Sequence, residues 1–194
     1  MADRYTQLYI HVTFAVKGRQ CLLAKAWRDK VFAYIIGIVN NKKQALITIN
    51  GVEDHIHFLV VVKPTVLLSE LVRDVKANSS RFINENNWVK GRFEWQEGYA
   101  AFSVGHAELG RIVNYIRQQE AHHKVKTFKE EYLSFLAENG VTYKPEYVFE
   151  KDSAAPPGLS RILIVFLKKC RSSGAQLLTN RCAKRYCLSG ALCR

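Results

Sequence analysis

Apolar and polar positions divide the first 140 residues into segments of two periodicities. Residues 8–16 (LYIHVTFAV) alternate and are rich in aromatic and β-branched side chains, which predicts a strand. In residues 22–40 the apolar positions recur at steps of three and four, which predicts an amphipathic helix. Residues 45–50 (ALITIN) and 55–62 (HIHFLVVV) predict two more strands, and the short GVED connection between them indicates an antiparallel hairpin.

The same patterns continue further along the chain. A second helix is expected after Pro64 and up to about residue 87, and residues 93–104 (FEWQEGYAAFSV) predict a fourth strand, interrupted by Gly98. Two further helices are expected over residues 107–123 and 128–139. The order strand, helix, strand, strand, helix, strand is typical of a ferredoxin-like α+β sandwich, an antiparallel sheet with helices on one face. The last two helices are then additions at its carboxy-terminal end.

A linker-like stretch, SAAPPG at residues 153–158, separates two regions of different composition. We therefore predict one folded domain over residues 1–150 and a basic tail over residues 151–194. The tail contains four of the five cysteines, but their irregular spacing matches no zinc-binding pattern. Its periodicity indicates neither helix nor strand, so a disordered segment and an accidental extension of the reading frame both stay open.

The net charge of +12 is typical of a protein that binds polyanions, but it is unevenly distributed. Residues 151–194 contain nine Lys or Arg and one acidic residue, whereas residues 1–150 contain 20 basic and 16 acidic residues. The tail would add nonspecific affinity for DNA through its charge. For the body of the chain, nucleic-acid binding has to be argued from particular residues.

Nothing in the sequence indicates a membrane protein. The amino-terminal residues, MADRYTQLYI, lead directly into a strand pattern and do not resemble a signal peptide. The apolar run ILIVFL in the tail is much shorter than the ~20 residues that a membrane-spanning helix needs. We expect a cytoplasmic protein.

The strand over residues 55–62 and the helix over residues 107–123 carry candidate catalytic and metal-binding side chains. His55 and His57 lie on one face of their strand, about 7 Å apart, because side chains alternate along a strand. Tyr115 and Gln119 are one helical turn apart on the polar side of their helix. A phenol and an amide that face two imidazoles would place a nucleophile beside a divalent metal site. Gln118 is the rival of Gln119, and two partly exposed histidines are the plainer interpretation of the pair.

Other polar residues have two interpretations each. His122 and His123 would bind phosphate or metal, or complement the dipole at the end of a helix. The segment VKANSSRF supplies candidate contacts to DNA phosphates, with a solvated helix surface as the alternative. These candidates are Lys76, Ser79, Ser80 and Arg81.

Four segments together resemble a known family. The HIH strand, WQEGYAAFSV, YIRQQEAHH and FKEEYLSFL occur in the order found in the single-tyrosine HUH transposases of the smallest bacterial insertion sequences, over roughly residues 5–149. The resemblance implies that His55, His57 and Gln119 hold one Mg²⁺ or Mn²⁺ at the scissile phosphate of single-stranded DNA. It also implies that Tyr115 attacks the phosphorus, becomes joined to the 5′ phosphate and releases a 3′ hydroxyl.

The resemblance further implies the partners of the protein. Members of the family are homodimers in which the tyrosine helix of one subunit completes the histidine site of the other. They recognise DNA hairpins near the ends of the transposon. Two alternatives stay open: a host-domesticated relative that acts on chromosomal repeat hairpins, and a noncatalytic binder of single-stranded nucleic acid. The presence of WQEGYAAFSV and YIRQQEAHH favours the mobile-element enzyme.

Overall fold

The computed structural model describes residues 5–123 and 127–144 of the 194-residue chain. The predicted boundary near residue 150 and the tail 151–194 lie outside the described residues. The elements follow the predicted order, with short 3-10 turns at Lys17–Arg19 and His106–Glu108. They are β1 (Tyr9–Ala15), α1 (Lys25–Asn41), β2 (Ala45–Gly51), β3 (His55–Val61), α2 (Leu68–Glu85), β4 (Ala100–Val104), α3 (Leu109–Arg117), α4 (Gln119–His122) and α5 (Phe128–Glu138).

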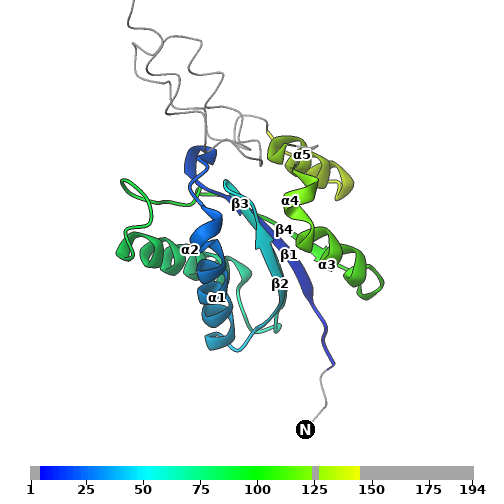
Figure 1. The fold of residues 1–194 in the computed structure, drawn as a ribbon. Helices are drawn as coiled ribbons and strands as arrows, with labels where there is room; N and C mark the ends of the chain where they lie inside the picture. The colour runs from blue at the N-terminus through cyan, green and yellow to red at the C-terminus, as the bar shows by residue number, and fades with distance from the viewer. Residues whose placement is uncertain (1–4, 124–126, 145–194) are drawn as a thin grey trace, which may run out of the picture.

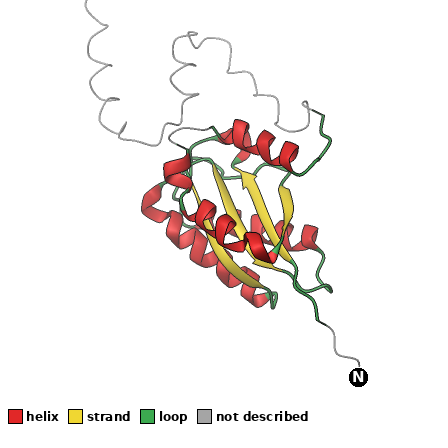
Figure 2. Cartoon of the chain, turned by 90° about the vertical axis from the view of Figure 1, so that its right-hand side faces the viewer, coloured by secondary structure: helices red, strands yellow, loops and turns green. Residues whose placement is uncertain are grey.

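The four strands form one antiparallel sheet in the order β2-β3-β1-β4, which confirms the ferredoxin-like α+β sandwich. Helices α1 and α2 cover one face (Figure 1). The additional helices α3, α4 and α5 lie on the opposite side of the sheet, the side that faces the viewer in Figure 2. The central strands β1 and β3 are therefore enclosed between two layers of helix.

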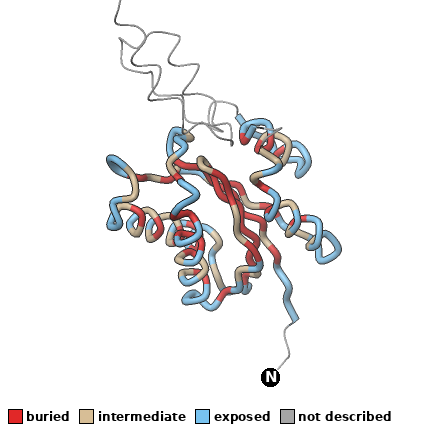
Figure 3. The backbone as a smooth tube through the Cα atoms, viewed as in Figure 1, coloured by how far each residue is buried: buried red, intermediate tan, exposed pale blue. Residues whose placement is uncertain are grey.

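This enclosure explains the burial of β1 and β3, which are buried along nearly their whole length (Figure 3). Phe14 on β1 and Phe58 on β3 point into the main apolar core beneath α1 and α2. The alternate positions point towards α3–α5, where the apolar residues form two smaller clusters. Between these clusters the same face carries buried polar side chains. They are His11, Thr13, His55 and His57.

Two predicted elements are shorter than expected. Of residues 93–104 only Ala100–Val104 form β4, and Trp95 makes an isolated bridge with Val16. The helix predicted over residues 107–123 is divided at Gln118, whose φ of −94° and ψ of 18° are not helical. The Asn50 side chain donates to the carbonyl oxygen of Arg117 at 2.9 Å and so occupies an acceptor of the helix. None of the helices in residues 5–123 and 127–144 is long and apolar enough to cross a membrane.

Gly51 provides a test of how closely β2 and β3 approach. A Cβ atom at Gly51 would lie 2.8 Å from the Cα of Ile56 and still closer to the carbonyl oxygen of His55, and neither backbone atom can rotate away. We expect Gly51→Ala to lower the free energy of unfolding by about 1–3 kcal/mol, a typical cost of overpacking. Urea unfolding measures this change.

Gly37→Ala is the matched control, because no atom lies within 4 Å of a Cβ built at this position in α1. This control should raise the free energy of unfolding by up to about 1 kcal/mol, since Ala favours helix over Gly. A Gly51→Ala variant as stable as the parent would contradict the close approach of the two strands.

Candidate active site

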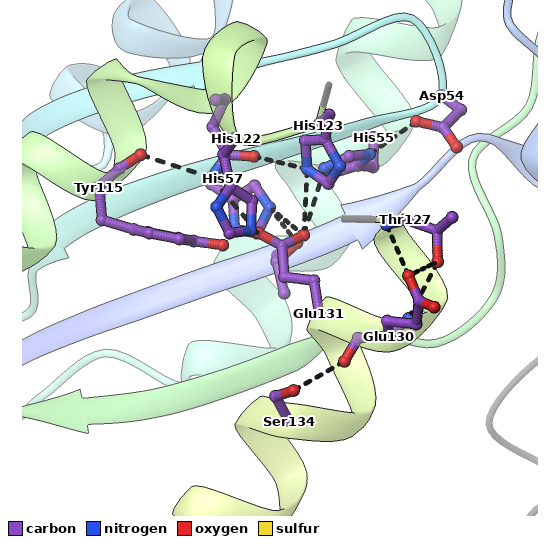
Figure 4. Close-up of polar contacts among 12 residues, drawn as sticks. Asp54, His55, His57, Tyr115, His122, His123, Thr127, Glu130, Glu131 and Ser134 are labelled. Carbon is purple, nitrogen blue, oxygen red and sulfur yellow. Dashed lines mark hydrogen bonds and ion pairs between the residues drawn. The ribbon is translucent and has the colours of Figure 1, made fainter. Parts of the chain in front are cut away.

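The buried polar residues of β1 and β3 meet polar residues from α3, α4 and α5 (Figure 4). His55 and His57 share a face of β3, as predicted, and both are completely buried. Gln119 begins α4, and Glu131 lies in the first turn of α5. Five of the six histidines of the chain gather here. They are His11, His55, His57, His122 and His123.

The carboxylate of Glu131 is at the centre of this group. Its Oε2 atom lies 3.6 Å from Nε2 of His55, 3.4 Å from Nε2 of His57 and 3.2 Å from Nε2 of His123. Its Oε1 atom lies 3.5 Å from Nε2 of His122. The side chain is only 2% exposed. One carboxylate thus approaches four imidazoles in a place that water barely reaches.

A capping box fixes the start of α5 and so the position of Glu131. The Thr127 hydroxyl accepts a hydrogen bond from the backbone N–H of Glu130, and the Glu130 carboxylate accepts one from the backbone N–H of Thr127. These reciprocal bonds satisfy two of the amides that a helix start leaves unpaired. The next residue, Glu131, then points at the sheet together with Phe128 and Tyr132, which are also buried.

Each strand histidine is held through its second ring nitrogen. Nδ1 of His55 lies 2.6 Å from the Asp54 carboxylate, and Nδ1 of His57 lies 3.0 Å from Nε2 of His11. Burial opposes ionisation of Asp54, but the hydrogen bond and charge of His55 keep its pKa below the ordinary value. Burial, with His57 nearby, lowers the pKa of His11 to about 3, so His11 is neutral and its Nε2 can accept a hydrogen bond from Nδ1–H of His57. In both histidines Nε2 is left facing Glu131.

Burial disfavours the charged forms of His57 and Glu131. Burial lowers the pKa of His57 well below its usual range, and the neighbouring histidines lower it further. Burial also raises the pKa of Glu131 to about 7; nearby His55 opposes this effect, and nearby Asp54 adds to it. A neutral imidazole is ready to bind a metal ion, and a bound cation would favour the ionised form of the carboxyl group.

The residues fit a divalent metal ion. Ligand atoms of His55, His57, His123 and Glu131 all lie within 4.8 Å of one another. Among the described residues, Nε2 of His55 and Oε2 of Glu131 are buried without a hydrogen-bond partner. Buried polar atoms normally have partners, and a cation between these two facing ligand atoms would satisfy both. Partners of His55 and His57 behind the ligand atoms are also typical of metal sites.

Tyr115 and Gln119 lie beside this group in the same chain. The Tyr115 ring is 5.9 Å from the His57 ring, and its hydroxyl points towards Glu131 in Figure 4. The hydroxyl oxygen is buried and makes no hydrogen bond within the described part of the chain. Gln119 is completely buried, and its Oε1 accepts from Nε2 of His123 at 2.9 Å. Gln118 is exposed, which favours Gln119 over its rival.

The predicted contacts to DNA divide into two groups. Lys76, Ser80 and Arg81 line a groove of about 850 Å³ between α2 and residues 92–99, on the other side of the sheet from Glu131. Ser79 was expected to contact DNA as well, but it is completely buried: its hydroxyl donates to the Val75 carbonyl and accepts from the Trp95 indole. His122 and His123, also predicted to contact DNA, face Glu131.

Sequence reasoning missed His11, Asp54 and Glu131. A signal for Glu131 exists, because it lies one helical turn after Phe128 and beside Tyr132, on the apolar stripe of its helix. His11 occupies the alternate position of β1 that also carries Thr13. Polar residues on the buried side of a helix or strand call for partners, and these three residues supply them to His55 and His57.

The raised pKa of Glu131 predicts a pH-dependent stability. Its folded-state pKa of about 7 lies above the ordinary value of 4.5, so the protonated side chain stabilises the fold and this contribution is lost as the pH rises through 7. Between pH 4.5 and 8, Glu131→Gln should therefore gain about 1–3 kcal/mol of unfolding free energy relative to the parent. Urea unfolding of metal-free protein measures the difference.

Glu138→Gln, an exposed change at the end of α5, is the control and should show no such gain. Parallel pH profiles of the parent and the Glu131→Gln variant would mean that burial of Glu131 does not raise its pKa.

Comparison with solved structures shows the same fold in two transposases. A candidate transposase from Deinococcus radiodurans R1 aligns with a TM-score of 0.50 and 21% identity, over 61% of this chain and 95% of its own. The REP-associated tyrosine transposase bound to a REP hairpin aligns with a TM-score of 0.50 and 13% identity, over 63% of this chain and 73% of its own. No curated protein matches the chain.

A comparison of the sequence with models of protein families identifies the family of this chain. The family model described as "Transposase IS200 like" matches residues 4–119, more than half of the chain, and includes both strand histidines and Tyr115. The match ends at Gln119, so His123 and Glu131 lie beyond it. With this match and the shared fold, the chain belongs to the IS200-like transposase family.

Proposed function

We propose that this transposase cleaves and rejoins single-stranded DNA through Tyr115, with a divalent metal held at His55 and His57. One observation carries the proposal: the Tyr115 hydroxyl is buried beside His57, pairs with no described residue and points at Glu131. The buried hydroxyl of a tyrosine with a purely structural role would normally take part in a hydrogen bond. A hydroxyl kept without a partner next to candidate metal ligands is available to a substrate.

The reaction is a transesterification at phosphorus. The Tyr115 oxygen forms a bond to the scissile phosphorus as the bond from phosphorus to the 3′ oxygen breaks. The phenol loses its proton, and the 3′ oxygen leaves as a hydroxyl group. The phosphotyrosine keeps the energy of the broken ester, so a second 3′ hydroxyl can attack it and restore a phosphodiester without ATP.

Several side chains serve this reaction by holding or orienting. His55 and His57 would hold Mg²⁺ or Mn²⁺ through Nε2, with Gln119 as the third ligand implied by the family resemblance. The cation would neutralise charge that grows on the phosphate oxygens. Asp54 and His11 orient the two imidazoles through their Nδ1 atoms.

We infer that DNA hairpins are the substrate and that they bind in the groove beside α2. Arg73 and Arg92 line this groove together with Lys76, Ser80 and Arg81. Lys76 donates to the carbonyl oxygens of Glu97 and Gly98, which holds one wall of the groove to the other. Guanidinium and hydroxyl groups along such a groove suit the phosphates of a DNA backbone. The REP-associated relative was solved with a REP hairpin bound.

A variant that lacks a single oxygen atom tests whether Tyr115 is the nucleophile. Tyr115→Phe should reduce the covalent adduct between protein and DNA to background, because the attacking oxygen is gone, while DNA binding is retained. The assay uses Mn²⁺, a hairpin oligonucleotide taken from the DNA that flanks the coding region, and a denaturing gel that detects the labelled 5′-phosphate fragment on the protein.

Tyr34→Phe is the matched control, because Tyr34 stacks on Phe82 on the α1 and α2 side of the sheet. It should form the adduct at the parental level. An adduct that persists in Tyr115→Phe would refute the assignment of the nucleophile, and an adduct absent from the parent protein would refute the cleavage proposal.

The positions of Tyr115 and His57 predict whether the tyrosine acts with the histidines of its own chain or with those of a partner chain. Tyr115 and His57 of a single chain lie together, so we infer that the tyrosine acts in cis, even in the homodimer that the resemblance implies. A mixture of Tyr115→Phe and His57→Ala chains, unfolded and refolded together, should then form no adduct. Recovery of about a quarter to half of the parental adduct would instead show a tyrosine that acts in trans.

A further inference from the structure

The group around Glu131 contains more ligands than the proposed cleavage reaction uses. Family resemblance assigns two histidines and one glutamine to the metal, whereas the structure adds His123 from the end of α4 and Glu131 from α5. Both additional residues lie beyond the part of the chain that matches the family model. The family match therefore does not explain why His123 and Glu131 lie beside His55 and His57.

The distances around Glu131 match one coordination geometry. In a tetrahedral zinc site with bonds of about 2.0–2.1 Å, any two ligand atoms are about 3.3–3.4 Å apart. Oε2 of Glu131 lies 3.6, 3.4 and 3.2 Å from Nε2 of His55, His57 and His123. An octahedral site with bonds of similar length would bring neighbouring ligands to about 3.0 Å. The three distances from Oε2 lie closer to the tetrahedral value, and the four ligand atoms all lie within 4.8 Å of one another.

We propose that His55, His57, His123 and Glu131 form a closed tetrahedral site for Zn²⁺, in which Gln119 is not a ligand. The proposal rests on the proposed function only in taking His55 and His57 as metal ligands. Three imidazole nitrogens and one carboxylate oxygen are ligands that zinc favours. Asp54 and His11 already hold the two strand histidines with Nε2 towards Glu131.

Zinc binding at this site requires a change of tautomer at His123. Without metal, Nε2 of His123 carries a proton and donates a hydrogen bond to Oε1 of Gln119 at 2.9 Å. To bind zinc through Nε2, neutral His123 must carry its proton on Nδ1 instead, and its hydrogen bond to Gln119 ends. Zinc binding therefore leaves the Gln119 amide oxygen without its His123 partner.

The closed site has a consequence for the enzyme. Four protein ligands fill a tetrahedral zinc ion and leave no position for a phosphate oxygen, whereas catalytic sites keep one open. The zinc-bound protein is then a resting form that does not cleave DNA. Cleavage with Mg²⁺ or Mn²⁺ requires His123 and Glu131 to leave the ligand set, so that Gln119 and a phosphate oxygen can take their positions.

The test is zinc binding by the metal-stripped full-length chain, measured by calorimetry with a competing chelator. The parent should bind one Zn²⁺ per chain, and X-ray absorption should show four nitrogen or oxygen neighbours including three imidazoles. Glu131→Gln and His123→Ala should each weaken binding by more than about tenfold, since even outer-shell partners are worth ~10–100-fold. Gln119→Ala and the exposed control Glu138→Gln should bind zinc at least as tightly as the parent.

Two results would contradict the zinc site. A parent chain that binds no zinc, or a Gln119→Ala loss as large as that of Glu131→Gln, would overturn the proposal. Melting temperatures without metal identify a variant that fails to fold, and Glu131→Asp then replaces Glu131→Gln, with weakened binding again expected. Tyr115→Phe should bind zinc normally, so the zinc result and the adduct result fail or succeed separately.

Discussion

The burial of one carboxylate among imidazoles is the constraint on which the candidate site depends. Glu131 reaches the sheet from α5, and its Oε2 atom lies between ligand nitrogens from β3 and from the end of α4. A buried carboxylate without an opposite charge is costly, and so is a buried ring nitrogen without a hydrogen-bond partner, such as Nε2 of His55. A bound cation satisfies both at once, so it would tie the helices α4 and α5 to the sheet.

The fold supplies this site by covering the sheet on both sides. Helices α1 and α2 bury Phe14, Phe58 and their neighbours in the main core, which provides most of the apolar burial. The opposite face is therefore free to carry polar residues between two small apolar clusters. Since side chains alternate along a strand, the same two strands serve stability on one face and chemistry on the other.

Much of this arrangement could be predicted from the sequence, because periodicity reports burial. Alternation in LYIHVTFAV and HIHFLVVV gave the central strands, and the spacing of Tyr115 and Gln119 gave their shared helical face. Contacts between distant segments carry no such signal. Glu131 was missed because only the packing of α5 brings it to His55 and His57, and Ser79 was misplaced because its partner, the Trp95 indole, comes from a loop that was read as strand.

The division of the tyrosine helix at Gln118 would keep strain on Tyr115 from reaching the proposed metal ligand Gln119. A continuous helix would carry Tyr115 and Gln119 as one rigid rod, so that strain on the DNA-linked phenol would pass directly to the metal ligands. Instead α3 ends at Arg117, and α4 is anchored independently to α1 by Glu120, which pairs with Lys25 and Arg28. If a DNA strand is joined to Tyr115 as proposed, a pull on it would be taken up at the joint, and the proposed metal ligands would stay in register with the sheet.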